Sequence, residues 1–286
     1  MPATFRDSSW PSTPRGVVIT GRSPTRFWRS NSGPRGTIRR EALVEEAFYR
    51  TVYEIEKTHW WCVARQRIVE DVIDRRIELP AGAQVLDVGC GSGAVLEALS
   101  ARFEAYGTDT SQLAIDLCRQ RGLPNAFCCT LETFPRKELR FDLVTLLDVV
   151  EHVDDDLGIL REAQRYVKTG GWTIVTVPAY QFLWGPHDVV NHHKRRYTRA
   201  GLRRVLQAAG FELRMLSYFN TILFPAAIAA WAGEKVVGIA ADPRPRVPPA
   251  PLNALLTTVF SMEKYLLRGL ALPYGLSLIA LARRSL

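Results

Sequence analysis

Short apolar runs alternate with amphipathic helical patterns through the middle of the chain. The apolar runs are continuous and end at turn residues, which predicts buried strands at 84–88, 105–109, 141–147, 172–177 and 211–218. Apolar residues recur at helical spacing between these runs, and the predicted helices cover 94–99, 111–121, 156–168 and 199–209. Strands that alternate with helices across short turns predict an α/β protein with a doubly wound parallel sheet.

The pattern differs at both ends of the chain. Residues 1–40 lack sustained periodicity and are rich in Ser, Pro and Arg, which predicts a disordered basic extension. Residues 41–82 carry two amphipathic helical patterns around His59-Trp60-Trp61 and form a predicted N-terminal helical cap. The two tryptophans either close over a ligand or pack the cap onto the sheet. Residues 219–275 are an apolar helical insertion before a last strand at 277–284, so the predicted core covers 83–218 plus 276–286.

The segment 84–94 combines a strand, a tight turn and a helix start. The strand ends at Asp87, and glycines then stand at positions 89, 91 and 93. Glycine at every second position permits positive φ and leaves room for a ligand beside the backbone. The next predicted strand ends in Asp109, 20 residues beyond Gly89, where a carboxylate can accept both hydroxyls of a ribose. The spacing differs from the G-x-G-x-x-G of NAD-binding proteins; such a domain and a loop without a ligand are the alternatives.

This D-x-G-x-G-x-G motif, the acidic residue after it, the Glu151-His152 pair and the glycine turn at 170–171 resemble class I S-adenosylmethionine (SAM) dependent methyltransferases. The resemblance spans residues 83–218 and extends to the type 11/12-like, ubiquinone-biosynthesis subgroup. It implies a Rossmann-like seven-stranded sheet of six parallel strands, with an antiparallel last strand between the fifth and the sixth, and SAM as cofactor. The residues that it implies for cofactor binding are Asp87, Gly89, Cys90, Gly91, Gly93, Asp109, Thr110, Thr130, Leu131 and Asp148.

One position departs from the family pattern. Many members place an acidic residue after the third strand, where it meets the adenine amino group, whereas this chain has Thr130. We therefore expect backbone groups or Glu132 to recognise the adenine.

A loop after the predicted strand 172–177 holds three of the five histidines, at 187, 192 and 193, among several aromatic residues. Ligands of open parallel sheets bind outside the carboxyl ends of the strands, where this loop emerges. The loop resembles the His-Asp and His-His-Arg-Arg-Tyr-Thr segments of related bacterial methyltransferases. A hydroxyl or ammonium acceptor must lose a proton, and the candidate bases are His152, His187 and His192. Each of these histidines, taken alone, can equally be a hydrogen-bonding residue of a loop.

A metal interpretation of the neighbouring segment stays open. Asp148, Glu151 and His152 follow the predicted strand 141–147, and some quinone O-methyltransferases that this region resembles hold a divalent metal with such residues. A hydrogen-bonded helix start explains the same three residues, and we favour it, so that no metal is predicted.

Most of the net charge of +8 belongs to the N-terminal extension. Residues 1–40 hold eight arginines and one acidic residue, Asp7, so the other 246 residues carry only +1. A nucleic-acid-binding face is therefore not expected. An Arg-rich, acid-poor start is also typical of an organelle transit peptide, or of a translation start placed upstream. The five cysteines lack metal-ligand or disulfide spacing and indicate reduced thiols in a cytoplasmic protein.

The apolar insertion, residues 219–275, gives information about the kind of acceptor that the protein binds. Its two apolar stretches, 222–231 and 252–272, are interrupted by charges or proline and are poor membrane spans. Apolar helices with scattered charges suit peripheral contact with the inner face of the cell membrane, or a cover over a lipid-binding site. Packing on the sheet and a homodimer contact are the alternatives.

These features together predict a SAM-dependent methyltransferase that acts, at oxygen, on a small-molecule or lipid-linked acceptor such as a quinone precursor. The alternative is a catalytically inactive SAM-binding module that serves as a partner subunit or membrane adaptor. The glycines and Asp109 do not separate the two, because they report cofactor binding rather than turnover. The histidine-rich loop favours the enzyme, since a pure binding module has little need of it.

Overall fold

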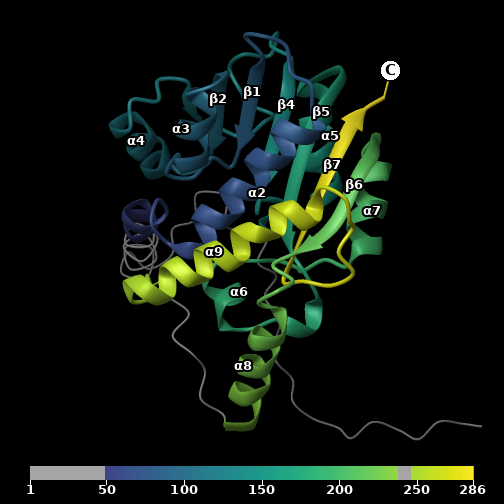
Figure 1. The fold of residues 1–286 in the computed structure, drawn as a ribbon. Coiled ribbons are helices and arrows are strands. Elements are labelled where there is room, and N and C mark those ends of the chain that lie inside the picture. Colours follow the sequence, from purple (N-terminus) through teal and green to yellow (C-terminus); the bar gives the residue numbers. More distant parts are fainter. Residues whose placement is uncertain (1–48, 238–245, 286) are drawn as a thin grey trace, which may run out of the picture. The chain divides into compact units, whose positions relative to one another are not determined.

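One mixed seven-stranded sheet organises the fold (Figure 1). The computed structural model describes residues 49–237 and 246–285, and only the backbone of 234–237. The predicted extension at 1–40 and residues 238–245 of the insertion lie outside the described residues. The described chain begins within a helix, at 49–55, and then enters the second helix of the predicted cap.

The strand order, β3-β2-β1-β4-β5-β7-β6, confirms the predicted sheet. The strands are β1 (Gln84–Val88), β2 (Glu104–Asp109), β3 (Ala126–Cys128), β4 (Phe141–Leu147), β5 (Val167–Pro178), β6 (Phe211–Phe219) and β7 (Ser277–Arg284). The strands β1 to β5 pair in parallel, and β7 is antiparallel to both β5 and β6. Six strands therefore run in one direction, and their carboxyl ends share one edge of the sheet.

The fifth strand is longer than predicted. It begins at Val167 rather than at Trp172, because the segment expected to be a turn continues alongside β4 with a register shift between Phe141 and Leu143. A register shift of this kind interrupts the alternation of apolar and polar residues, so the sequence pattern does not predict this part of the strand.

Helices cover both faces of the sheet. They are α2 (Trp60–Arg76), α3 (Ala94–Ser100), α4 (Gln112–Gln120), α5 (Asp156–Tyr166), α6 (Pro186–Val190), α7 (Arg199–Ala208), α8 (Phe224–Val237) and α9 (Ala250–Leu267), with short 3-10 helices η1 (Val150–His152) and η2 (Gln181–Leu183). Ser111, Asp155 and Thr198 each accept a hydrogen bond from the backbone N–H three residues on, which explains where α4, α5 and α7 begin.

The core has two layers, as a doubly wound sheet requires. Successive residues of a strand point to opposite faces. Leu143 and Ile174 pack in the layer with residues of α2, α3, α4 and α9, whereas Val144 and Val175 pack in the layer with residues of α5 and α7. The alternation along each central strand thus fixes which helix covers which face.

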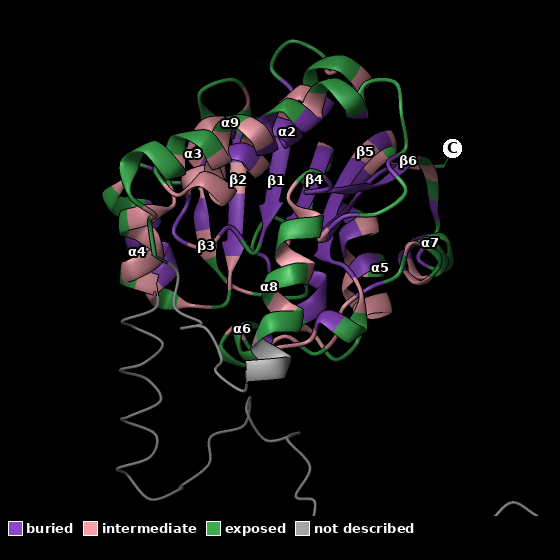
Figure 2. Cartoon of the chain, turned by 60° about the horizontal axis from the view of Figure 1, so that its bottom comes forward, coloured by how far each residue is buried: buried purple, intermediate pink, exposed green. Residues whose placement is uncertain are grey.

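The insertion divides into two parts with different environments. Helix α9 lies along α2: the rings of Trp60 and Phe260 are 5.9 Å apart, and the side chain of Asn253 accepts a hydrogen bond from the Trp60 N–H at 3.0 Å. Helix α8 instead extends away from the sheet, and its residues 224–233 are exposed or half-buried (Figures 1 and 2). No helix among the described residues is long and apolar enough to cross a membrane.

Backbone strain is concentrated at the carboxyl edge of the sheet. In the described chain, four residues other than glycine have positive φ: Asp148, Tyr180, His192 and Asn220. Three of them follow the ends of β4, β5 and β6, and the fourth lies in the loop after β5. Such conformations cost about 1–3 kcal/mol each and cluster at functional sites, so they direct attention to this edge.

Candidate active site

The glycine turn after β1 is held open at its centre. Gly89, Gly91 and Gly93 have φ of 68°, 54° and 93°, which other residues rarely adopt. A Cβ on Gly89 would lie 2.6 Å from a Val149 methyl group, and one on Gly93 would lie 2.8 Å from the Cys118 sulfur. A Cβ on Gly91 would meet nothing within 4 Å. The outer glycines are therefore required by packing, while Gly91 faces open space that a ligand can enter.

Asp109 joins this turn to the end of β2. One carboxylate oxygen accepts a hydrogen bond from the Gly91 N–H at 2.9 Å, and the other accepts one from the Ser111 N–H at 2.9 Å. The carboxylate therefore lies beside the open glycine, where a ribose diol would need it. Thr110, the next residue, is exposed, and Cys90 is buried beneath the turn. The residues fit a nucleoside-containing cofactor such as SAM.

The N-terminal cap contacts the same turn. Glu56 accepts a hydrogen bond from the Ser92 hydroxyl at 2.7 Å and pairs with Arg121 at 2.5 Å. The Arg121 guanidinium also lies 4.2 Å from the centre of the Tyr53 ring. These contacts tie residues 53–56 to the glycine turn, so the cap bears directly on the cofactor region.

Two acidic groups at this edge, Asp148 and Asp87, lie near one cation that the sequence did not single out. Arg65, on α2, forms an ion pair with Asp148 at the end of β4 and lies 4.7 Å from the centre of the Trp61 ring. Asp87 is 3% exposed and accepts a hydrogen bond from the Thr145 hydroxyl at 2.6 Å. Burial raises the pKa of Asp87 to about 6, and the nearby Asp109 adds to the rise, while the hydrogen bond from Thr145 and the charge of Arg65 oppose it. The only sequence signal for Arg65 was its place in an amphipathic helix.

The segment after β3 presents the predicted adenine region. Thr130 is exposed, and its hydroxyl lies 3.1 Å from that of Thr133 in a local turn. The Leu131 side chain is buried, and its carbonyl accepts a hydrogen bond from the Tyr166 hydroxyl at 2.9 Å. The exposed carboxylate of Glu132 follows. A hydroxyl and backbone groups, rather than a buried acid, are thus available there.

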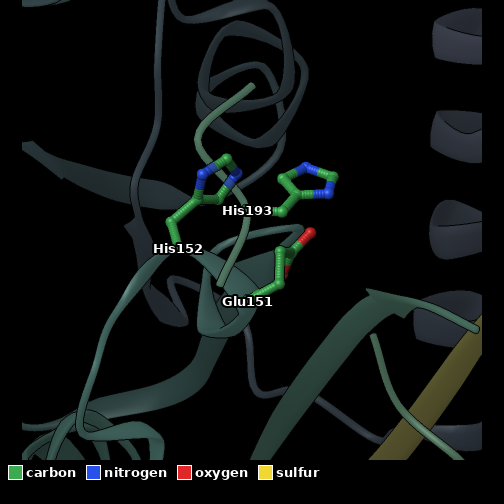
Figure 3. Close-up of side chains that lie close together, drawn as sticks. All are labelled: Glu151, His152 and His193. Atoms are coloured by element: carbon green, nitrogen blue, oxygen red, sulfur yellow. The ribbon is translucent and has the colours of Figure 1, made fainter. Parts of the chain in front are cut away.

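Two imidazoles and a carboxylate come together in a second cluster at this edge (Figure 3). Glu151 and His152 lie on η1, and His193 comes from the loop after β5; their ligand atoms are all within 4.8 Å of one another. The rings of His152 and His193 are 4.7 Å apart, and those of His187 and His193 are 6.1 Å apart. Two of the three predicted bases, His152 and His187, therefore meet around His193, while His192 is exposed in a left-handed conformation.

The two members on η1 have shifted pKa values. Glu151 is fully buried, and neither of its oxygens has a hydrogen-bond partner. Burial and the nearby charge of Asp148 raise the pKa of Glu151. Desolvation and then the proximity of His193 lower the pKa of His152, so its ring is neutral at neutral pH.

Buried Asp188 holds the histidine-rich loop together by hydrogen bonds to three of its residues. It is fully buried and accepts hydrogen bonds from the Gly185 N–H at 2.9 Å, the Arg196 Nε–H at 2.7 Å and His193 Nδ1 at 2.8 Å. Burial alone would raise the pKa of Asp188, but the hydrogen bonds from His193 and Arg196 outweigh it and hold the pKa below its usual range. Sequence reasoning missed His193 and Asp188 as a pair, although both belong to the histidine-rich segment that it had singled out.

An aromatic wall continues from this loop towards α8. Tyr180 stacks on Tyr218 with ring centres 5.1 Å apart, and it lies 5.8 Å from Phe224 at the start of α8. Phe182 packs against Trp231 of α8 at 5.9 Å. Planar or apolar groups of an acceptor would find a matching surface here.

Comparisons with known proteins agree with this geometry. A family model described as a methyltransferase domain matches residues 63–216. A ubiquinone biosynthesis O-methyltransferase of Chromobacterium violaceum is 30% identical over 167 residues, which cover 51% of this chain and 72% of that protein. The protein of the same name from Bordetella avium is 34% identical over 98 residues, or 32% of this chain and 41% of that protein. The chain thus matches less than half of the length of the Bordetella avium relative.

Two solved structures share the fold. A chain in the complex between the Haloferax volcanii Trm112 methyltransferase activator and a methyltransferase has a TM-score of 0.54 at 18% identity, over 86% of this chain and 97% of that one. The [4+2]-cyclase SpnF has a TM-score of 0.50 at 22% identity, over 77% of this chain and 81% of its own. At these identities the likeness shows the fold alone, and a cyclase on this fold illustrates that the fold does not dictate the reaction.

Proposed function

The chain belongs to the methyltransferase-domain family and is a SAM-dependent methyltransferase, and from this premise we propose that it methylates an oxygen of a small, amphiphilic or lipid-linked acceptor. Relatives named ubiquinone biosynthesis O-methyltransferases support oxygen as the acceptor atom. The glycine turn with Asp109 fits the adenosine part of SAM, and the imidazole cluster with the aromatic wall fits the acceptor.

One contact carries this proposal. A Val149 methyl group fills the space where a Cβ of Gly89 would lie. Val149 is flanked by Asp148 on one side and by Glu151 and His152 on the other, so the segment that presents the imidazole cluster packs directly on the cofactor turn. A methyl group bound beside the turn would therefore be adjacent to the cluster.

The chemistry demanded of the chain is modest. The positive sulfur makes the methyl group of SAM electrophilic, so the protein has to align an acceptor oxygen with the methyl–sulfur bond and exclude competing water. The methyl–sulfur bonding pair stays on sulfur, which gives S-adenosylhomocysteine, and the hydroxyl proton of the acceptor leaves to a base. We assign proton removal to the cluster formed by His152, His187 and His193, with His192 at its exposed margin.

Transfer of a labelled methyl group tests the proposed function. We expect the protein to move label from methyl-labelled SAM into the organic phase of a bacterial lipid extract, and an Asp109→Ala variant to move none. If the natural chain binds SAM but labels no compound in the lipid or aqueous fractions, the proposal fails, and an inactive SAM-binding module becomes the better description.

The affinity for SAM should fall about tenfold between pH 7 and pH 5. The pKa of Asp87 is about 6 in the free chain, so the carboxyl is mostly protonated at pH 5. The positive charges of SAM favour the ionised carboxylate, and binding must then release the proton; one pKa unit corresponds to a factor of ten. Calorimetric titration at pH 5, 6 and 7 measures the trend, and Asp87→Asn should flatten it. An equal slope in that variant would assign the effect to another group.

We also propose that α8 and the histidine loop meet a lipid surface. Phe182 and Val189 are 55% and 61% exposed; Phe182 packs against Trp231 of α8, and Val189 lies on α6 of the histidine-rich loop. An exposed apolar surface beside the acceptor region suits an acceptor that is drawn from a bilayer.

Flotation with anionic liposomes tests this contact. A Phe182→Asp, Val189→Asp double variant should bind vesicles more than about tenfold more weakly, because burying two such side chains contributes about 3 kcal/mol or more. Leu255→Asp is the matched control, since Leu255 is 59% exposed but lies on α9. Loss of binding in the control alone would move the lipid surface to α9.

A further inference from the structure

Glu151 is the least explained side chain of the site. It is fully buried, and both carboxylate oxygens lack a hydrogen-bond partner, although nearly all buried polar groups in proteins have one. A helix-start network was the expected role for this residue, but a capping carboxylate would accept N–H groups of η1. A bound ligand with positive charge would satisfy both oxygens and would remove the cost of burying them alone.

The two imidazoles beside Glu151 are prepared to act as electron-pair donors. The Nδ1 atom of His193 lies 2.8 Å from Asp188, whose carboxylate is also held by Arg196. A carboxylate oxygen at this distance accepts the Nδ1–H of His193, which leaves the lone pair on Nε2. Metal-binding histidines in proteins are commonly oriented in this way, by a carboxylate on the second ring nitrogen. His152 faces His193 across 4.7 Å between ring centres.

Asp148 is not available to complete such a site. It forms an ion pair with the Arg65 side chain, which approaches from α2 on the side of the glycine turn. The resemblance to quinone O-methyltransferases implies a metal set of Asp148, Glu151 and His152, whereas in the structure His193, from the loop after β5, joins Glu151 and His152.

We propose that Glu151, His152 and His193 bind one divalent transition-metal ion, with Asp188 and Arg196 as the outer support. Two nitrogen ligands and one carboxylate oxygen favour ions such as Zn²⁺, Co²⁺ or Mn²⁺ over Mg²⁺ and Ca²⁺, which prefer oxygen ligands. Three protein ligands leave a position open for an acceptor oxygen, and an ion there would lower the pKa of the acceptor hydroxyl. His187, the third ring of the cluster, then remains to take the proton. The use of the ion rests on the proposed function, whereas its binding does not.

Titration of the full chain with Co²⁺, after treatment with a chelator, tests the site without any acceptor. We expect one Co²⁺ ion to bind per chain and to give visible ligand-field absorption. Added Zn²⁺ should displace the bound Co²⁺, whereas Mg²⁺ at a hundred times that Zn²⁺ concentration should not. Replacement of His193 with alanine should weaken binding by more than about 100-fold, and Asp188→Asn by about tenfold or more, as found for outer-shell groups. Glu151→Gln should also remove binding while the chain stays folded in the absence of metal, because Glu151 has no partner to lose.

Two matched variants separate this ligand set from its neighbours. Asp148→Asn and His192→Ala should bind Co²⁺ within about twofold of the natural chain. Loss of binding in Asp148→Asn together with retention in His193→Ala would overturn the proposed set, as would unchanged binding in Glu151→Gln. SAM titration of the same samples keeps the two proposals apart. SAM binding and methyl transfer without Co²⁺ binding contradict the metal site alone, whereas Co²⁺ binding without methyl transfer contradicts the proposed function alone.

Discussion

An Asp109→Ala variant is expected to bind SAM at least about 100-fold more weakly than the natural chain while keeping its fold. The carboxylate offers two oxygens beside the open side of Gly91, and each can accept a hydroxyl of the ribose. Hydrogen bonds to a charged group contribute about 1.5–3 kcal/mol each, and about 1.4 kcal/mol corresponds to a factor of ten. Losing two of them gives the stated reduction.

The same carboxylate also positions the cofactor turn. Its oxygens accept the N–H groups of Gly91 and Ser111 at 2.9 Å, so the alanine variant loosens the turn as well as removing the ribose partner. Calorimetric titration with SAM measures the affinity, and thermal unfolding checks the fold. Asp116→Ala is the matched control, because Asp116 is a half-buried aspartate of α4 whose side chain contacts only its helix neighbours Gln112 and Arg119 among the hydrogen bonds of the described residues. Equal SAM affinity in the two variants would exclude Asp109 from the cofactor site.

Replacing Asp188 with asparagine should lower the free energy of unfolding by about 3 kcal/mol, because removing one partner of a buried ion pair leaves the other uncompensated. Asp188 is fully buried and holds three donors, from Gly185, His193 and Arg196. An amide carries less charge and has one acceptor atom instead of two, so the Arg196 guanidinium would stay poorly compensated beneath the histidine loop.

A double variant distinguishes this explanation from a general packing defect. In an Asp188→Asn, Arg196→Met protein, the uncompensated cation is gone, so part of the lost stability should return. Urea unfolding measures Asp188→Asn, Arg196→Met and the double variant, and Asp154→Asn serves as the control because Asp154 is an exposed carboxylate whose partner, Lys194, lies 3.5 Å away. If the double variant lost more unfolding free energy than the two single variants lose together, the ion-pair explanation would be contradicted.

The elements of the fold were predictable because their signals are local. The alternation of apolar runs and helical patterns located the long strands of the sheet and the helices on both of its faces. The antiparallel last strand came from the resemblance rather than from the residues. The early start of β5 was missed, since a register shift against β4 carries no periodic signal.

The cofactor half of the site was also local in origin. Glycines at alternate positions and a carboxylate at the end of the next strand describe a turn and its partner, and the structure brings Gly91 and Asp109 together by a direct hydrogen bond. Parallel pairing of β1 with β2 guarantees this, because adjacent parallel strands end at the same edge.

By itself, the sequence determined the parallel sheet, the glycine turn with its acidic partner, and the carboxyl edge as the place of the chemistry. Only the tertiary structure decided that α9 packs along α2, that Arg65 forms an ion pair with Asp148, and that His193 rather than His192 joins Glu151 and His152. Each of those pairings joins segments tens of residues apart in the chain. Periodicity and spacing act over one or two turns of helix or strand, so they fix which elements form, whereas the meeting of distant side chains depends on how those elements pack.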